Sequence, residues 1–395
     1  MASRDITITE ALSIIQKSIK APSTETIHFK DALNRVLATD LVSKCDMPPF
    51  DKSAMDGYAC KQSDLTKNLH IIGEIAAGGD FSIEVNEGEA VRIMTGAPIP
   101  KGANWVVMKE ISRESDGEVY FEKTPSQSNI CSKGEDLKKG DLILKKGTIL
   151  TSREIAVITS AGYSDILVFQ KPKVAIFATG NELIEPGMPL PEGKIYNSNG
   201  HQLMAEVMNM GLAATYLNII PDNFNDVLTS LTEATEKYDL VILTGGVSVG
   251  DYDFIPLALR KLHFDIKFDT LSTKPGKHTV FANNGERYVL GLPGNPVSTL
   301  VQFEIVGKEI IYRMQGADAL KTIQFKAPLA VDFKRKSADR LEYLPAKLND
   351  NGEIELLFYN GSAHIAALTN ATILITIPIG VQSVKKGDLL DARPL

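Results

Sequence analysis

The chain has 395 residues, more than one ordinary hydrophobic core holds, so two to four domains are expected. Hydrophobic residues make up 44% and charged residues 23% of the sequence, as is typical of a soluble globular protein. The net charge of −7 argues against nucleic-acid binding and means that local lysines must attract any anionic ligand.

The three cysteines, Cys45, Cys60 and Cys131, form no CxxC pair and no zinc-type cluster with histidine. We interpret them as reduced, semi-buried hydrophobic side chains. The N-terminus lacks a signal-peptide pattern, and no window offers the ~18 apolar residues of a membrane span. We therefore expect a cytoplasmic protein without membrane contact.

The first predicted element is an amphipathic helix whose N-terminal capping box is formed by Thr7 and Glu10. A second helix is predicted at about 151–161, with Gly162 as its C-terminal cap. Together with short strands, these helices define a discontinuous helical/β N-terminal domain of residues 1–45 and 137–171.

Residues 46–136, between those two segments, are rich in short strands and turns. Apolar stretches such as Leu69–Gly73 and Ala90–Met94 alternate with clusters of Gly, Asp and Lys. No helical period longer than two turns occurs there. This pattern predicts an inserted β-rich domain.

From Lys173 onward, continuous apolar strands alternate with helices. Strands are predicted at 174–178, 215–220, 240–243 and 288–290, and helices at 201–210, 225–237 and 297–314. This alternation is typical of a doubly wound, mostly parallel sheet, which we assign to a central α/β domain of residues 172–318. Ligands of such sheets bind at the carboxyl ends of the strands.

Beyond about Thr322 the hydrophobic period reverts to two. Strands are predicted at 327–331, 342–344, 354–358 and 373–377, with a hairpin turn at 349–352. We interpret residues 319–395 as a C-terminal β-barrel domain.

A glycine-rich loop from Thr244 to Asp253 follows the apolar run Leu240–Leu243. Its three glycines permit backbone N–H groups to approach an anion closely. The carboxylates of Asp251 and Asp253 cannot bind phosphate themselves but can hold a divalent cation. The loop therefore predicts a phosphorylated ligand bridged by a metal ion. The residues expected to contact that ligand are Gly245, Gly246, Ser248 and Gly250.

Two further loops follow strands of the same sheet. One carries Glu182, and the other places Asn295 and Ser298 at a helix start, where free N–H groups favour an anion. A third segment, Lys274-Pro275-Gly276-Lys277, adds two ammonium groups suited to phosphate or another oxyanion. The three strand-end loops, which carry Glu182, the glycine-rich segment and Asn295, lie on one sheet and favour a single anion-binding site.

Several common enzyme classes are disfavoured. The glycines are not followed by Gly-Lys-Ser/Thr, and the loop after the first α/β strand is not Gly-x-Gly-x-x-Gly. A P-loop NTPase and a nicotinamide Rossmann enzyme are therefore both disfavoured. No Ser/His/Asp arrangement stands out either.

Seven motifs, in order along nearly the whole chain, resemble those of the molybdopterin molybdenumtransferases, the MoeA proteins and the E domain of gephyrin. They are Pro-Phe-Asp-Lys-Ser-Ala-Met-Asp-Gly-Tyr-Ala (49–59), Ile-Met-Thr-Gly-Ala-Pro-Ile-Pro (93–100), Gly-Glu-Asp (134–136), Ala-Thr-Gly-Asn-Glu-Leu (178–183), Thr-Gly-Gly-Val-Ser-Val-Gly-Asp-Tyr-Asp (244–253), Lys-Pro-Gly-Lys (274–277) and Leu-Pro-Gly-Asn-Pro-Val-Ser (292–298).

The resemblance implies an elongated, four-domain homodimer in which the N-terminal domain mediates dimerisation. The implied reaction is insertion of molybdate into adenylylated molybdopterin, with hydrolytic release of AMP and assistance from Mg²⁺. The implied partners are those two substrates, with the adenylyltransferase and molybdoenzyme acceptors as further candidates.

Residue by residue, the resemblance implies roles for two groups. The implied catalytic residues are Asp56, Thr95, Asp136, Glu182 and Asp251, of which Glu182 and Asp251 position Mg²⁺ and Asp56 and Thr95 come from the partner subunit. The implied molybdate ligands are Lys274, Lys277, Ser298, Arg340 and Ser362.

The sequence also departs from the family pattern. Asn181 replaces a frequent Asp, Pro345 stands where the family commonly has an arginine, and Ala366 and Ala367 stand where it has serines. These departures leave open a paralogue of altered activity that acts as a scaffold. A molybdopterin adenylyltransferase is a second alternative, and tungstate is an alternative to molybdate.

Overall fold

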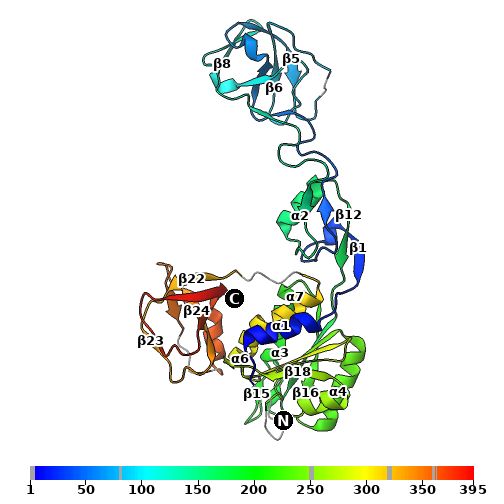
Figure 1. Cartoon of the computed structure of the whole chain (residues 1–395), viewed down its shortest axis with the longest axis vertical. Coiled ribbons are helices and arrows are strands. Elements are labelled where there is room, and N and C mark those ends of the chain that lie inside the picture. The colour runs from blue at the N-terminus through cyan, green and yellow to red at the C-terminus, as the bar shows by residue number, and fades with distance from the viewer. Residues whose placement is uncertain (1–4, 80–81, 249–252, 318–322, 358–360, 362) are drawn as a thin grey trace. The chain divides into compact units, whose positions relative to one another are not determined.

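The computed structural model of the chain describes residues 5–79, 82–248, 253–317, 323–357, 361 and 363–395. Its contacts divide the chain into two compact units (Figure 1). The first comprises Met1–Ala38, Gly147–Thr151 and Leu167–Leu395, and the second comprises Thr39–Lys146 and Ser152–Ile166. The predicted four-domain boundaries are finer than this division and stay a prediction.

Helix α1 (Ile8–Ser18) begins with the predicted capping box. The Glu10 N–H donates to Thr7 Oγ1 at 3.2 Å, and the Thr7 N–H donates to the Glu10 carboxylate at 2.8 Å. The buried face of the helix, with Ala11 and Ile15, joins the core of the α/β sheet.

The central sheet of the first unit has six strands in the order β16-β13-β17-β21-β20-β18. Their bounds are Ala214–Ile220 (β16), Val174–Thr179 (β13), Leu240–Thr244 (β17), Tyr288–Leu292 (β21), His278–Asn283 (β20) and Asp265–Thr270 (β18). The first four pair in parallel, and β20 and β18 extend the sheet antiparallel. The predicted α/β class is confirmed, with a mixed sheet.

Helices cover both faces of this sheet, because alternate residues of each strand point to opposite sides. On one face Ile176, Ile242 and Leu290 share a core with α1, α3 (Asn199–Asn209), α6 (Pro296–Gln302) and α7 (Lys308–Met314). On the other face Val241 and Val289 pack with α4 (Phe224–Lys237) and α5 (Ile255–Lys261).

Three local details differ from the sequence prediction. Helix α3 begins at Asn199, two residues before its predicted start. The predicted helix 297–314 is interrupted by a π-helical turn, Phe303–Gly307, which a 3.6-residue period does not distinguish. Strands β18 and β20 had not been predicted, because charged residues interrupt the apolar pattern of β18.

A second six-stranded sheet lies at the C-terminal end of the same unit, in the order β19-β24-β26-β28-β22, with β25 beside β24. Its strands are Thr273–Lys274 (β19), Leu341–Leu348 (β24), Ile373–Ile377 (β26), Leu389–Pro394 (β28), Phe325–Pro328 (β22) and Ile354–Leu356 (β25). The predicted hairpin turn joins β24 to β25, and Gly352 has a positive φ of 75° there. Closure of this sheet into a barrel stays a prediction.

One strand of that sheet comes from the α/β part of the chain. Strand β19 lies between β18 and β20 in sequence, yet it pairs in parallel with β24. Lys274 therefore lies opposite Glu342 in the register. This pairing connects the predicted lysine loop to the C-terminal sheet.

The second unit holds a six-stranded sheet in the order β7-β4-β6-β5-β9-β8. Its strands are Trp105–Met108 (β7), Gly57–Cys60 (β4), Glu89–Ile93 (β6), Leu69–Ile75 (β5), Glu118–Phe121 (β9) and Ser112–Ser115 (β8). Helix α2 (Ser152–Ser160) belongs to the same unit. In the described part of 46–136 the only helices are short 3-10 turns, as the β-rich prediction required.

All three cysteines are free, and the buried position of Cys60 raises the pKa of its thiol to about 12. This agrees with their interpretation as hydrophobic side chains. Within the described part of the chain, no helix has both the length and the apolar character needed to cross a bilayer.

Replacing Leu290 by Ala should destabilise the first unit by about 2–5 kcal/mol, because this fully buried side chain fills the centre of the sheet core. Leu257→Ala is the matched control, since Leu257 is 52% exposed on α5 and its loss should cost less than about 0.5 kcal/mol. Denaturant unfolding of both variants measures the difference. Equal unfolding free energies would contradict the placement of Leu290 in the core.

Candidate active site

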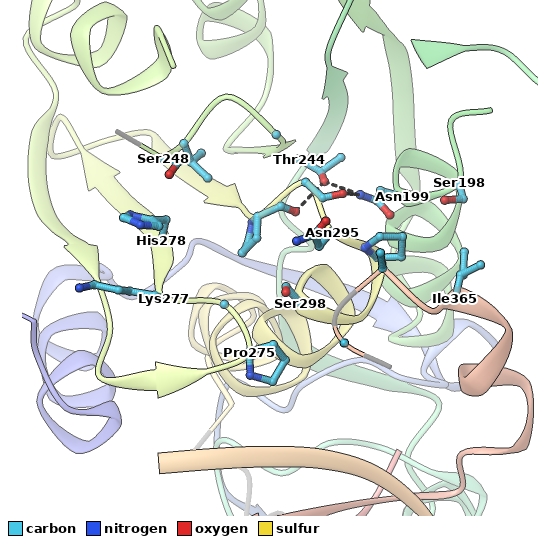
Figure 2. A pocket seen from close by; sticks show the side chains of 18 of the residues that line it. Ser198, Asn199, Thr244, Ser248, Pro275, Lys277, His278, Asn295, Ser298 and Ile365 are labelled. Carbon is cyan, nitrogen blue, oxygen red and sulfur yellow. Dashed lines mark hydrogen bonds between the residues drawn. The ribbon is translucent and has the colours of Figure 1, made fainter. Parts of the chain in front are cut away.

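A cavity of about 1440 Å³ lies at the carboxyl ends of β13, β17 and β21 (Figure 2). Its walls come from the α/β sheet and the C-terminal sheet, which belong to one compact unit. The predicted site residues that line it are Glu182, Gly245, Gly246, Ser248, Lys274, Lys277, Asn295 and Ser298. The three strand-end loops and the lysine loop therefore meet in one place.

Strand β17 ends so close to β13 that position 245 has no room for a side chain. A Cβ atom there would lie 2.7 Å from both the carbonyl O and Oγ1 of Thr179, and the residue has a φ of +92°. The Gly245 N–H donates to the Leu292 carbonyl at 3.0 Å. The glycine thus brings the ends of three neighbouring strands together at the cavity wall.

The side-chain amide of Asn199, at the start of α3, ties these loops to one another (Figure 2). Its Nδ2 donates to Thr244 Oγ1 at 3.0 Å and to the Gly294 carbonyl at 2.7 Å. Thr244 Oγ1 in turn donates to the Pro293 carbonyl at 3.1 Å. One amide therefore connects the glycine-rich loop with the loop that carries Asn295 and Ser298.

The lysine loop rests on Gln302, a buried residue of α6. Gln302 Nε2 donates to the Pro275 carbonyl at 2.8 Å and to Thr273 Oγ1 at 3.2 Å. A Cβ atom on Gly276, where φ is +91°, would lie 2.3 Å from Gln302 Cγ. The loop between Lys274 and Lys277 therefore requires a glycine at this position.

Each lysine of this loop has a carboxylate partner. Lys274 Nζ lies 2.7 Å from Glu342 Oε1, and Lys277 Nζ lies 2.9 Å from Asp5 Oδ2. An ammonium group has three donors, so each lysine keeps further N–H groups for a ligand in the cavity. The exposed Lys334 also lines this wall, which makes it basic.

The opposite chemistry occurs at the ends of the α/β strands, where the carboxylates of Glu182, Asp222 and Asp253 line the cavity. Within the described ranges, no three His, Cys, Asp or Glu residues lie close enough to form a complete metal cage. Mg²⁺ does not need one, because it commonly takes one or two carboxylates and completes its shell with phosphate oxygens and water. The donors present therefore fit a Mg²⁺ ion that arrives with a phosphorylated ligand.

Several predicted residues have no described place in the cavity. Gly250, Asp251 and Ser362 lie outside the described residues. Arg340 is not among the lining residues. Its Nη1 donates to the carbonyl of Thr273, the residue before Lys274, at 3.3 Å. Pro345 is buried in β24 opposite Leu374.

The predicted residues Asp56, Thr95 and Asp136 belong to the second unit. The N–H and the Oγ1 of Thr95 both donate to Asp56 Oδ1, each at 2.7 Å. These two hydrogen bonds, the backbone one first, hold the pKa of Asp56 below its usual range. Residues from two separate motifs are thus brought together, with the carboxylate kept ionised.

Some lining residues were not predicted from the sequence. Ser198 and Asn199 could have been found, since they stand at the beginning of a helix, where free N–H groups and polar side chains can face a ligand. Lys334 and Glu342 gave no such signal. Glu342 reaches the cavity through long-range pairing in the C-terminal sheet, and Lys334 lies in a two-residue strand, Phe333–Lys334, that pairs with Ser383–Val384.

Three family models together match most of the chain. The MoeA N-terminal region (domain I and II) matches residues 6–162, the probable molybdopterin binding domain matches 175–313, and the MoeA C-terminal region (domain IV) matches 326–395. The chain thus contains the regions of a MoeA-type protein, in order, over nearly its whole length.

Similar proteins agree with these matches. A molybdopterin molybdenumtransferase of Staphylococcus epidermidis is 34% identical, with 98% of this chain and 94% of that protein covered. One of Haemophilus influenzae is 33% identical, with 98% of each covered. The crystal structure of a molybdopterin biosynthesis MoeA protein from Pyrococcus horikoshii matches with a TM-score of 0.83 and 30% identity, covering 99% of this chain and 100% of that one.

The fold and the cavity together define a multidomain α/β enzyme. The chain belongs to the molybdopterin molybdenumtransferases, an enzyme family of molybdenum cofactor biosynthesis.

Replacing Gly276 by Ala should destabilise the protein more than replacing Gly285, although both have φ near +90°. Both variants incur a backbone strain of about 1–2 kcal/mol, but only position 276 adds a clash with Gln302, because nothing lies within 4 Å of a Cβ at position 285. Denaturant unfolding compares the two. Equal losses would contradict the close packing of the lysine loop on Gln302.

Proposed function

We propose that this chain acts in the cytoplasm and inserts molybdate into adenylylated molybdopterin, releasing AMP and forming the molybdenum cofactor. Water cleaves the phosphoanhydride in this reaction, so that AMP leaves and the pterin keeps its own phosphate. The single observation that carries the proposal is the cavity that gathers strand-end carboxylates and the Lys274/Lys277 pair around one space. The reaction named for the similar enzymes requires such a site for two anions.

The glycine-rich loop and the loop before α6 are assigned to the phosphates of the pterin nucleotide. Gly246 and Gly250 offer backbone N–H groups, and Ser248, Asn295 and Ser298 offer polar side chains. Gly245, whose N–H donates to the Leu292 carbonyl, contributes by leaving room for the ligand beside the strand ends. The half-buried side-chain amide of Asn199 supports this assignment, because it holds two of these loops in a fixed relation.

The metal and oxyanion ligands are assigned by chemistry. Glu182 and Asp251 would hold Mg²⁺, which as a Lewis acid neutralises charge on the phosphates when it is bound. Lys274 and Lys277 attract molybdate, a tetrahedral dianion, with Ser298, Arg340 and Ser362 as further ligands or supports. Local lysines are needed because the chain as a whole is negative.

We further propose a homodimer in which the second unit of one subunit completes the cavity of the other. Asp56, Thr95 and Asp136 are the residues supplied in this way. The ionised Asp56 carboxylate supports a catalytic role. Asp56 and Thr95 come from distant motifs, and hydrogen bonds at an exposed position hold them together.

Purified protein supplied with adenylylated molybdopterin, Mg²⁺ and molybdate should release AMP only when molybdate is present. Glu182→Gln should slow this release roughly 10- to 100-fold, because the metal loses a charged ligand. Glu192→Gln is the control, since Glu192 is exposed and does not line the cavity. AMP is followed by chromatography.

Three results would contradict the proposal. AMP release that does not depend on molybdate would argue against the insertion reaction. Transfer of AMP from ATP to free molybdopterin would identify an adenylyltransferase, and substrate binding without turnover would identify a scaffold.

The dimer proposal predicts complementation between two inactive variants. When Asp56→Asn and Glu182→Gln subunits are mixed and exchanged, about a quarter of the sites should be intact, because half of the dimers are mixed and each has one unaltered site. AMP release by the mixture measures the recovery. A mixture as inactive as its components, with exchange verified by mass spectrometry, would rule out shared sites.

A further inference from the structure

A buried carboxylate that no motif pointed to lies behind the lysine loop. Glu342, in β24, lines the cavity wall, yet its side chain is only 4% exposed. Its two oxygens face two different cations: Oε1 lies 2.7 Å from Lys274 Nζ, and Oε2 lies 3.4 Å from Arg335 Nη1. A carboxylate in such a position is stable only because it is paired.

Arg335 is the fixed member of this group. Its side chain is 2% exposed, and its guanidinium donates to the backbone carbonyls of Val381, Arg340 and Pro378 at 2.6, 3.0 and 2.5 Å. With the contact to Glu342, four of its five N–H donors have partners in the C-terminal part of the chain, which holds the guanidinium in place. Its role toward Glu342 is that of a permanent counter-ion.

Lys274 is the adjustable member. Its side chain is 48% exposed, and its flexible stem would otherwise let the ammonium group move through solvent. The parallel register of β19 and β24 places it directly opposite Glu342. Backbone pairing and the ion pair together restrict the ammonium group to one side of the cavity wall.

The charges of the three residues do not cancel. Two cations and one carboxylate leave one positive charge, and that charge belongs to the only exposed member, Lys274. Because an ammonium group has three donors, Lys274 can donate to Glu342 and still offer two N–H groups to an oxyanion.

The Lys277 ion pair differs from the Lys274 pair in the burial of its carboxylate. Asp5, its partner, has a side chain that is 37% exposed, so solvent screens that pair and it restricts the lysine only weakly. Of the two lysines in the loop, Lys274 is the one with a buried, anchored partner.

We propose that Glu342 is a positioning residue that holds the Lys274 ammonium group in place for the oxyanion substrate. It acts through Lys274 and does not touch the substrate itself. The inference rests on the proposed assignment of Lys274 to molybdate.

Equilibrium binding of molybdate to the full-length protein, followed by calorimetry, tests this role. Glu342→Gln should weaken binding about tenfold, since one charge-assisted hydrogen bond that orients the ammonium group is lost. The same variant should raise the KM for molybdate more than it lowers kcat, because the reacting pterin site is left unchanged.

A control ion pair exists in the same sheet. Lys347 on β24 pairs with Glu355 on β25 at 3.1 Å, in register and away from the cavity lining. Glu355→Gln removes an exposed cross-strand ion pair of the same sheet, with a carboxylate that is 48% exposed, and should leave molybdate binding unchanged.

A double-mutant cycle separates positioning from a merely structural role. In a Lys274→Ala background, Glu342→Gln should have no further effect on molybdate binding, because the group through which it acts is gone. If Glu342→Gln weakens binding equally in both backgrounds, or if it binds molybdate as well as the wild type, the inference is overturned.

Two further outcomes are covered. If Glu342→Gln does not fold, Glu342→Asp keeps the charge but withdraws the carboxylate by one methylene, and a smaller loss of affinity is expected; unchanged affinity in that folded variant overturns the inference. A wild-type protein that binds no molybdate overturns the proposed function as well, which distinguishes the two failures.

Discussion

The parallel pairing of β13, β17 and β21 is the constraint on which the site depends. The registers Ala178 to Thr244 and Thr244 to Leu292 place the ends of the three strands level with one another. Loops that are far apart in sequence must therefore emerge side by side. Thr244, at the centre, accepts the Asn199 amide and donates to Pro293, so hydrogen bonds complete what the register begins.

Charge is distributed in the cavity against the sign of the whole chain. The protein carries a net charge of −7, yet its basic wall gathers lysines that are held by individual carboxylates. These partners limit the positive field to a few positions, while Glu182 and the neighbouring acids remain at the strand ends. This separation of charge is what the proposed binding of two anions and Mg²⁺ would require.

The sequence predicted the parts of the site that follow local rules. Continuous apolar runs located β13, β17 and β21, and the glycine and proline loops after them identified Glu182, Ser248 and Asn295 among the lining residues. The capping box at Thr7 was also confirmed, because such a cap depends on residues only three apart. Resemblance to a family, not residue pattern, pointed to Asp56 and Thr95.

What remained hidden depends on long-range pairing. Glu342 reaches the cavity because β19, a two-residue strand, pairs with β24, and no periodicity marks so short an element. Asn199 was missed because the helix boundary was placed two residues late, which is enough to remove a residue from a site. The π-helical turn before α7 could not be predicted, because its sequence has the same hydrophobic period as an ordinary α-helix.

The central claim is that the lysine loop of this cavity binds molybdate. Crystals grown with molybdate and measured at the molybdenum absorption edge would locate the metal directly by its anomalous scattering. We expect one strong peak inside the cavity, within hydrogen-bonding reach of Lys274 and Lys277 through its oxygens. A fully occupied molybdenum site elsewhere, with this cavity empty, would contradict the account.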